Sequence, residues 1–286
     1  MTKPAKGQEF GLPRRVELEY EKAMGQIIGK VLPPKYPNET FEEWLGKIAE
    51  LSSRKDVQEA CDLLASRMVG WVGAVNERSW RAASKKAQRS DYLYSLLNKE
   101  LQGPIGARVA QLTRENSRLI SSLPHTAAVT LVDEITKAAQ KGARPSTLAK
   151  LARVRFPQLL KSRVNLIART ETAKASAALT HARCEALGIQ FYIWRTSEDV
   201  RVRASHKKMD GVVVPWDDPP SPERLVGEPS QGHYNAGEIY NCRCTQIVVL
   251  TVDDIKFPAK VYYKGAVRQV NKRDFQKLFN LERRAA

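Results

Sequence analysis

Long apolar runs are absent from this sequence of 286 residues. A helix that crosses a bilayer needs about 20 mainly apolar residues, so no membrane span is expected. The first 15 residues, MTKPAKGQEFGLPRR, lack the apolar core of a secretory signal, so we predict none there. With 42% hydrophobic and 27% charged residues, the composition is that of a globular protein with one large or two smaller domains.

Common catalytic motifs are missing as well. The chain has no GxSxG, no GxGxxG and no P-loop, and it does not satisfy the H-x-E…P-C-x-x-C signature of the zinc deaminases. The fragments HKKMDG and GHYN are only loosely similar to the motifs of His/Asn metal nucleases. A metal-dependent nuclease is therefore the enzyme class that stays open as an alternative.

Cysteine is scarce. The four residues Cys61, Cys184, Cys242 and Cys244 are too few and too irregularly spaced for a disulfide framework, which favours a reducing compartment. On an extended strand, the side chains of Cys242 and Cys244 would point the same way but lie roughly 6–7 Å apart, too far for a relaxed disulfide. A bent loop would instead let both sulfurs bind one metal ion.

A zinc site is a candidate for this pair, because zinc prefers thiolate and imidazole ligands. His206 lies in a turn of the same region and would be the third ligand. A structural site needs a fourth ligand, and the candidates are His233, Asp210 and Asp217. The alternative is that the two thiols are small buried side chains beside a strand, with no metal.

Basic residues outnumber acidic ones, with a net charge of +16. Residues 141–208 carry 15 Lys and Arg against 4 Asp and Glu, and residues 256–286 carry 9 against 2, whereas residues 209–255 carry 2 against 8. Such basic blocks favour a polyanion such as double-stranded DNA, although a solvated surface is the alternative. The candidate DNA-binding residues are Lys150, Arg153, Arg155, Lys161, Arg163, Lys207, Lys208, Lys272 and Arg273.

Hydrophobic periodicity predicts a helical first part and a sheet in the last third of the chain. Helices are expected over residues 19–32, 38–51 (with Asn38 or Thr40 as N-cap), 56–87, 127–144, 145–156 and 158–187, with breaks at SLPH (122–125) and Pro157. Strands are expected over 191–196, 211–216 and 245–250, followed by a hairpin over 261–270 that turns at Lys264-Gly265 and a short helix over 271–284. The order predicts an α+β fold in which a long helix packs on a small, mostly antiparallel sheet.

Two features stand out within this pattern. Residues 217–238 form a loop that is long enough to be functional, disordered or held in place by other contacts. Glu171 falls on the apolar face of the long helix, where a carboxylate is costly unless a cation meets it. We expect an ion pair between Glu171 and an arginine of the sheet region, and the candidates are Arg201, Arg203 and Arg243. The alternative role for Glu171 is that of a general base in catalysis.

Four short motifs follow one another between residues 122 and 250. They are Arg169-Thr170-Glu171 on a helix, T-x-x-D-x-R at Thr196, Asp199 and Arg201, the turn Asp210-Gly211, and NCRC at residues 241–244. In this order they resemble the phage Mu F-like minor head proteins, also called head morphogenesis proteins. Members of that family commonly carry a C-x-x-C pair before the glycine turn, where this chain has Arg203 and His206. Some members also carry a His just before NCRC, where this chain has Ile239-Tyr240.

The resemblance implies a non-enzymatic virion protein, found in the phage head and in the host cytoplasm during assembly. Its expected partners are portal protein, scaffold or major capsid protein, and double-stranded DNA, with a role in genome packaging or delivery. The implied organisation is a portal- or scaffold-facing helical region (1–120), a Mu F-like domain (121–255) and a basic hairpin with a helix (256–286). The enzyme alternative then becomes a metal-dependent nuclease or another phage-borne toxin.

Overall fold

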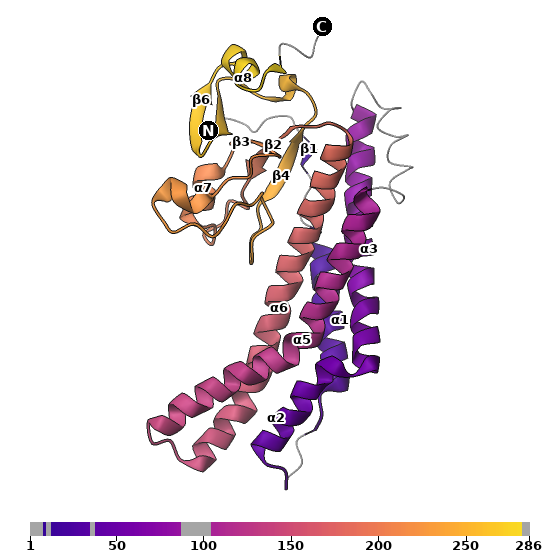
Figure 1. The fold of residues 1–286 in the computed structure, drawn as a ribbon, viewed down its shortest axis with the longest axis vertical. Helices are drawn as coiled ribbons and strands as arrows, with labels where there is room; N and C mark the ends of the chain where they lie inside the picture. Colours follow the sequence, from indigo (N-terminus) through magenta and orange to yellow (C-terminus); the bar gives the residue numbers. More distant parts are fainter. Residues whose placement is uncertain (1–7, 10–12, 35–37, 87–103, 282–286) are drawn as a thin grey trace. The chain divides into compact units, whose positions relative to one another are not determined.

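The computed structural model describes residues 8–9, 13–34, 38–86 and 104–281, and Figure 1 shows their fold. The chain divides into two compact units. The helical unit comprises residues 13–72 and 109–172, and the sheet unit comprises the described parts of residues 1–12, 73–108 and 173–286. These limits differ from the predicted boundaries: residue 120 falls inside a helix, and residues 256–270 belong to the same sheet as the preceding strands.

Five α-helices supply the residues of the helical unit, and three of them continue in sequence into the sheet unit. They are α1 (Arg14–Val31), α2 (Phe41–Glu50), α3 (Lys55–Lys86), α5 (Pro104–Gln140) and α6 (Pro145–Ala186). A short 3₁₀ turn, Leu51–Ser53, joins α2 to α3. The predicted helical first part of the chain is therefore confirmed.

The two predicted breaks at prolines are wrong. Pro124 lies inside α5 and Pro157 lies inside α6. An interior proline costs a helix about 3 kcal/mol. Both helices bury apolar side chains on either side of the proline, such as Leu123 and Ala127 in α5, and this burial offsets the cost.

Helix α2 begins at a capping box. The Thr40 hydroxyl accepts a hydrogen bond from the Glu43 backbone N–H (3.2 Å), and the Glu43 carboxylate accepts one from the Thr40 N–H (2.8 Å). This arrangement satisfies two backbone donors that the first helical turn leaves without partners. Thr40, and not Asn38, is therefore the N-cap. Trp44, the fourth residue of α2, packs edge-on against Phe156 of α6, with the ring centroids 4.9 Å apart.

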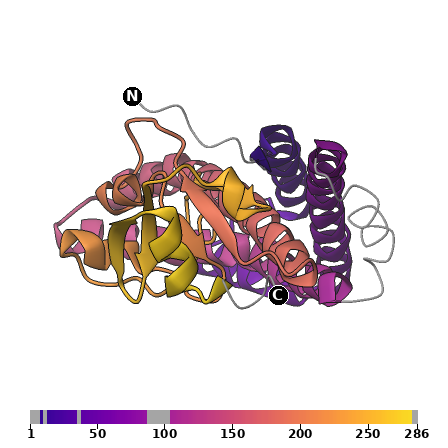
Figure 2. The same ribbon diagram turned by 90° about the horizontal axis from the view of Figure 1, so that it is seen from above.

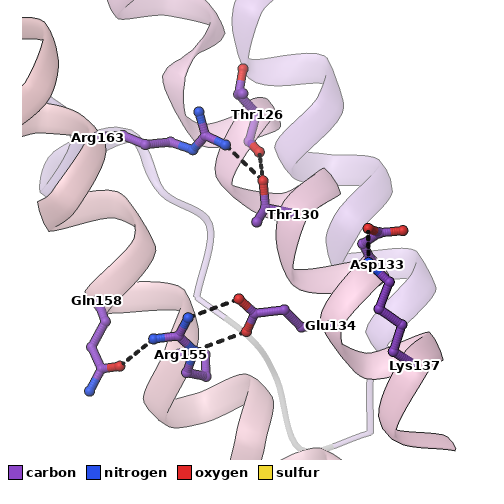
Figure 3. A network of polar contacts seen from close by, with 8 residues as sticks. All are labelled: Thr126, Thr130, Asp133, Glu134, Lys137, Arg155, Gln158 and Arg163. Atoms are coloured by element: carbon purple, nitrogen blue, oxygen red, sulfur yellow. Dashed lines mark hydrogen bonds and ion pairs between the residues drawn. The ribbon is translucent and has the colours of Figure 1, made fainter.

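Charged contacts join α5 to α6 within the helical unit, as Figure 3 shows. Arg155 donates to both carboxylate oxygens of Glu134 (2.9 and 2.8 Å) and to Gln158 (2.9 Å). Arg163 donates to the Thr130 hydroxyl at 2.7 Å. Two of the predicted DNA-binding arginines therefore hold one helix against the other.

The sheet unit contains one sheet with the strand order β1-β4-β2-β3-β5-β6. All pairs of neighbours are antiparallel except β3 and β5, which are parallel. This confirms the predicted α+β class with a mostly antiparallel sheet, including the hairpin turn at Lys264-Gly265. The strands are β1 (Gln8–Glu9), β2 (Phe191–Arg195), β3 (Val213–Pro215), β4 (Thr245–Val249), β5 (Ala259–Tyr263) and β6 (Ala266–Val270).

Helices cover the sheet. Residues 173–186 of α6 pack on one side, where the His181 ring stacks on Trp216 at 4.6 Å and Cys184 is fully buried. On the other side, α8 (Lys272–Leu278) places Phe275 against Phe191 at 5.1 Å. Helix α8 lies next to the β5–β6 hairpin in both ribbon views (Figures 1 and 2). The long helix therefore packs on the sheet as predicted.

One glycine sets how closely the loop before β4 approaches α6. Gly237 has a φ of 87°, and a Cβ there would lie 3.1 Å from the Cys244 carbonyl oxygen and 3.4 Å from the Ala177 Cβ. Only glycine adopts this backbone conformation without strain and also leaves room for both neighbours. Gly237 thereby fixes the path of the chain as it enters the NCRC segment (residues 241–244).

Candidate metal centre

A short helix carries His206 into the interior of the sheet unit. Helix α7 (Ala204–Met209) follows β2 after a turn, and His206 is 2% exposed. Asp210, just after α7, accepts hydrogen bonds from the Thr196 backbone N–H (2.8 Å) and hydroxyl (2.9 Å), and the Gly211 N–H donates to the Trp194 carbonyl (2.9 Å). The end of α7 is thus tied to the end of β2, which fixes the position of the histidine.

The NCRC segment bends before β4 begins. Asn241 takes a left-handed conformation with a φ of 55°, and the Cys244 backbone N–H donates to the Cys242 sulfur at 3.4 Å. Strand β4 starts only at Thr245, so the two cysteines are not held at strand spacing. The bend directs both sulfurs, each on a nearly fully buried side chain, toward α7.

His206 and the two cysteines form a compact cluster. The His206 Nδ1 atom lies 3.6 Å from the Cys242 sulfur and 3.4 Å from the Cys244 sulfur. The three ligand atoms lie within 4.8 Å of one another. Over the part of the chain that the structure describes, no other group of three His, Cys, Asp or Glu side chains converges in this way. The structure thereby brings together three of the residues that the sequence analysis named as metal ligands.

The other nitrogen of His206 is held by a tyrosine and a glutamate from the long loop. The His206 Nε2 atom lies 3.1 Å from the Tyr234 hydroxyl, and that hydroxyl donates to the Glu223 carboxylate. Since the hydroxyl proton is used on Glu223, the Tyr234 oxygen accepts a hydrogen bond from the Nε2–H of His206. The Nδ1 atom of the ring faces the two sulfurs.

Both Glu223 and Tyr234 are buried, and the sequence analysis did not identify them. Glu223 is 1% exposed and lies in a 3₁₀ turn (Pro222–Val226). Burial, followed by the hydrogen bond to Glu223, raises the pKa of Tyr234 well above its usual value. The one sequence signal for these two residues was the length of the loop over residues 217–238, because a loop this long is usually held in place by contacts of its own.

The two thiols have opposite tendencies to ionise. The hydrogen bond from Cys244, followed by the nearby His206, lowers the pKa of the Cys242 thiol, although burial opposes this. The same bond to Cys242, together with burial, raises the pKa of the Cys244 thiol.

Arginines surround a small cavity of about 90 Å³ beside the cluster. Arg243 pairs with Asp199 at 2.5 Å, and Arg201 lies 3.8 Å from the same carboxylate. The hydrogen bond from the Arg201 backbone N–H, followed by the charges of Arg243 and Arg201, lowers the pKa of Asp199. Arg203 donates to the Tyr240 carbonyl at 3.0 Å and stacks over the Tyr240 ring. The cavity is lined by these arginines with Ser197, Val202, Asn241 and the three cluster residues.

These pairs correct the prediction for Glu171. That carboxylate is 4% exposed, as its place on the apolar helix face suggested, but it belongs to the helical unit and acts on Tyr20, whose pKa it raises after the effect of burial. Arg201 and Arg243 instead meet Asp199: Arg201 lies two residues from it in the turn after β2, and Arg243 reaches it from the NCRC segment. Arg169 of the same motif pairs with Glu17 at 3.5 Å.

The predicted fourth ligands do not join the cluster. His233 is exposed, and its Nδ1 atom lies 2.9 Å from the Pro219 carbonyl oxygen. The Asp210 carboxylate accepts hydrogen bonds from Thr196, and Asp217 is exposed.

The predicted DNA-binding residues lie on both units. In the helical unit, Lys150, Arg153 and Lys161 are exposed on α6, whereas Arg155 and Arg163 contact α5. In the sheet unit, Lys207 and Lys208 are exposed on α7, and Lys272 and Arg273 are exposed on α8. Lys272 pairs with Asp253 at 2.7 Å. Among the described residues, no helix is long and apolar enough to cross a membrane.

Comparisons with known proteins agree with the motifs. Residues 130–247 match the family model described as "Phage Mu protein F like protein". An uncharacterized protein of Haemophilus influenzae is 30% identical over 207 residues, a match that covers 72% of this chain and 43% of that protein. This chain therefore spans less than half the length of that relative. No solved structure matches this chain. The matched segment contains α7, the long loop and the NCRC segment, and over these residues the chain is similar to the phage Mu protein F-like family.

Proposed function

We propose that this chain is a phage minor head protein that acts in head morphogenesis. The observation that carries the proposal is the family match over residues 130–247. That segment contains the four motifs on which the resemblance rests, from Arg169 to Cys244. The proposed location is the phage head, with the host cytoplasm as the place of assembly.

The helical unit is the proposed contact with portal protein. Its surface carries a groove of about 970 Å³ whose apolar lining includes Trp44, Ile135 and Phe156. Lys150 and Arg153 also line this groove, so its charge suits an acidic segment of a partner. Because the groove includes residues of α5 and α6, this contact extends beyond the region 1–120 that the sequence analysis assigned to the portal or scaffold.

Double-stranded DNA is the second proposed partner, in genome packaging or delivery. The net charge of +16 and the exposed Lys150, Arg153 and Lys161 on α6 support it, as do Lys207 and Lys208 on α7. Lysine and arginine contacts to phosphate release counterions, so such binding weakens steeply as salt rises. Because Arg155 and Arg163 already contact α5, we assign the contact to the exposed residues alone.

Mass spectrometry of purified virions from a host that carries the intact phage tests the proposal. We expect the chain in the particles, and we expect a tagged copy to capture portal protein from lysates of cells assembling heads. Particles that lack the chain, formed at normal yield with normal DNA content, would overturn a role in the head. Cleavage of plasmid by the purified chain with Mg²⁺ or Zn²⁺ would instead favour a nuclease.

A further inference from the structure

We propose that His206, Cys242 and Cys244 bind one zinc ion, with the fourth coordination position facing the arginine-lined cavity. The proposal concerns the sheet unit alone and does not depend on the role in the phage head. It rests on the distances between the three ligand atoms, on their chemistry, and on the hydrogen bonds that orient His206. Each is argued in turn.

The distances fit a tetrahedral ion. Zinc is bound by sulfur at about 2.3 Å and by nitrogen at about 2.1 Å, which in a tetrahedron separates the sulfur and nitrogen atoms by about 3.6 Å. The His206 Nδ1 atom lies 3.6 and 3.4 Å from the sulfurs of Cys242 and Cys244. The two sulfurs lie within 4.8 Å of each other, and a tetrahedral zinc ion would hold them about 3.8 Å apart, so binding would draw them together by at most about 1 Å.

The chemistry of the ligands selects the metal. Two sulfurs and one imidazole nitrogen suit zinc, whereas magnesium and calcium require oxygen ligands, and no carboxylate takes part in the described cluster. An iron–sulfur cluster is usually held by four cysteines, and the two other cysteines of the chain, Cys61 and Cys184, are not part of this group. All four cysteines are free thiols.

The surroundings of His206 are those of a ligand. A histidine that binds a metal usually donates its second ring N–H to an oxygen, which fixes the ring and its tautomer. Here the Nε2–H meets Tyr234, and Tyr234 donates to the buried Glu223. This relay holds the ring so that Nδ1, the ring nitrogen that would bind the zinc ion, faces both sulfurs.

The fourth position has space for a small ligand. In the described part of the chain no further His, Cys, Asp or Glu completes the cluster, and the adjoining cavity measures about 90 Å³. That volume is enough for a water molecule. Arg201, Arg203 and Arg243 line the same cavity, and Asp199 pairs with the first and the last of them.

Metal analysis of the full-length chain tests the proposal. The protein is expressed with added zinc, dialysed against metal-free buffer and analysed by inductively coupled plasma mass spectrometry. We expect about one zinc per chain, and a loss of at least about tenfold in His206→Ala and in the double variant Cys242→Ser, Cys244→Ser. His233→Ala is the matched control, because this exposed histidine of the same region lies outside the cluster and should leave the zinc content unchanged.

Cobalt and thiol labelling on the unaltered protein keep the test decisive if a variant misfolds. Cobalt added to the metal-free protein should give the intense visible bands of a tetrahedral site and a thiolate charge-transfer band. Zinc should protect Cys242 and Cys244 from alkylation, and a chelator should expose them. Zinc content well below one per chain, octahedral cobalt bands, equal alkylation with and without chelator, or a Cys242–Cys244 disulfide in the native protein would each overturn the proposal.

Discussion

The Nε2 atom of His206 lies 3.1 Å from the hydroxyl of Tyr234, a residue that is 28 positions further along the chain. The contact joins α7 to the long loop, and Glu223 closes it from the 3₁₀ turn. Through this one hydrogen bond a loop with little regular structure determines how the histidine presents its other nitrogen to Cys242 and Cys244. Three segments that are distant in sequence thereby form one buried site.

Tyr234→Phe is expected to weaken zinc binding while the protein stays folded. The change removes the acceptor for the His206 Nε2–H and leaves the ring in place. Loss of such a hydrogen-bond partner typically lowers metal affinity by about 10- to 100-fold. Competition with a chromophoric chelator measures the affinity. Tyr240→Phe is the matched control, because Tyr240 is exposed and its carbonyl, not its hydroxyl, bonds Arg203. An equal effect of both changes would contradict the role of Tyr234 in orienting His206.

Removal of zinc is expected to lower the melting temperature of the sheet unit. A ligand that binds only the folded state contributes about 4 kcal/mol at 1,000 times its Kd. For domains of this size each kcal/mol corresponds to about 2–4 °C, so we expect a shift of about 10 °C. Differential scanning calorimetry with and without chelator measures it. His206→Ala should melt at the same temperature in both conditions, and a chelator-dependent shift in that variant would place the metal elsewhere.

Much of the fold was predictable because local signals decide it. Thr40 begins α2 as a capping residue, and Lys264-Gly265 turns the C-terminal hairpin, both as expected from residue type. The prolines at 124 and 157 misled the prediction, since burial of neighbouring side chains keeps both helices continuous. Tertiary packing, which a local pattern does not contain, decided those two places.

The candidate site was predictable only in part. The residue types and the order of the motifs identified His206, Cys242 and Cys244, because thiols and imidazole have few other shared uses. The partners Tyr234 and Glu223 were missed, since a tyrosine and a glutamate in a loop carry no metal-binding signal. Glu171 was correctly placed on a buried face, but two of its three candidate arginines, Arg201 and Arg243, meet Asp199, and Arg203 bonds the Tyr240 carbonyl.

Gly237→Ala is expected to destabilise the sheet unit more than Gly227→Ala does. Both glycines have a positive φ, of 87° and 77°, so both changes impose backbone strain of about 1 kcal/mol or more. Only at Gly237 would the new methyl group also lie 3.1 Å from the Cys244 carbonyl oxygen. Urea unfolding should show an additional loss of about 1–2 kcal/mol for the first variant. Equal losses would show that the close approach to the NCRC segment does not matter.

The ion pair between Glu134 and Arg155 is expected to make the helical unit less stable in acid. Arg155 lowers the pKa of Glu134 below its usual value of 4.5. A lowered folded-state pKa contributes stability above the unfolded pKa, and this stability is lost as the pH falls through the folded-state value. Urea unfolding at pH 7 and pH 3 measures the difference, which Glu134→Gln should reduce. Asp133→Asn is the control, since Asp133 pairs only with exposed Lys137 on its own helix (Figure 3).

Charge removal on α7 is expected to reduce the salt dependence of DNA binding. Lys207 and Lys208 are exposed, and the double change to Gln leaves the buried face of α7 intact. Each phosphate contact contributes about 0.9 to the slope of log K against log salt concentration, so the slope should fall by about 1.8. Fluorescence anisotropy with a duplex at several salt concentrations measures it. Arg155→Gln is the control. Because Arg155 is held by Glu134, this change should leave the slope unchanged. An unchanged slope in the α7 variant would assign DNA contact to α6 or exclude it from this surface.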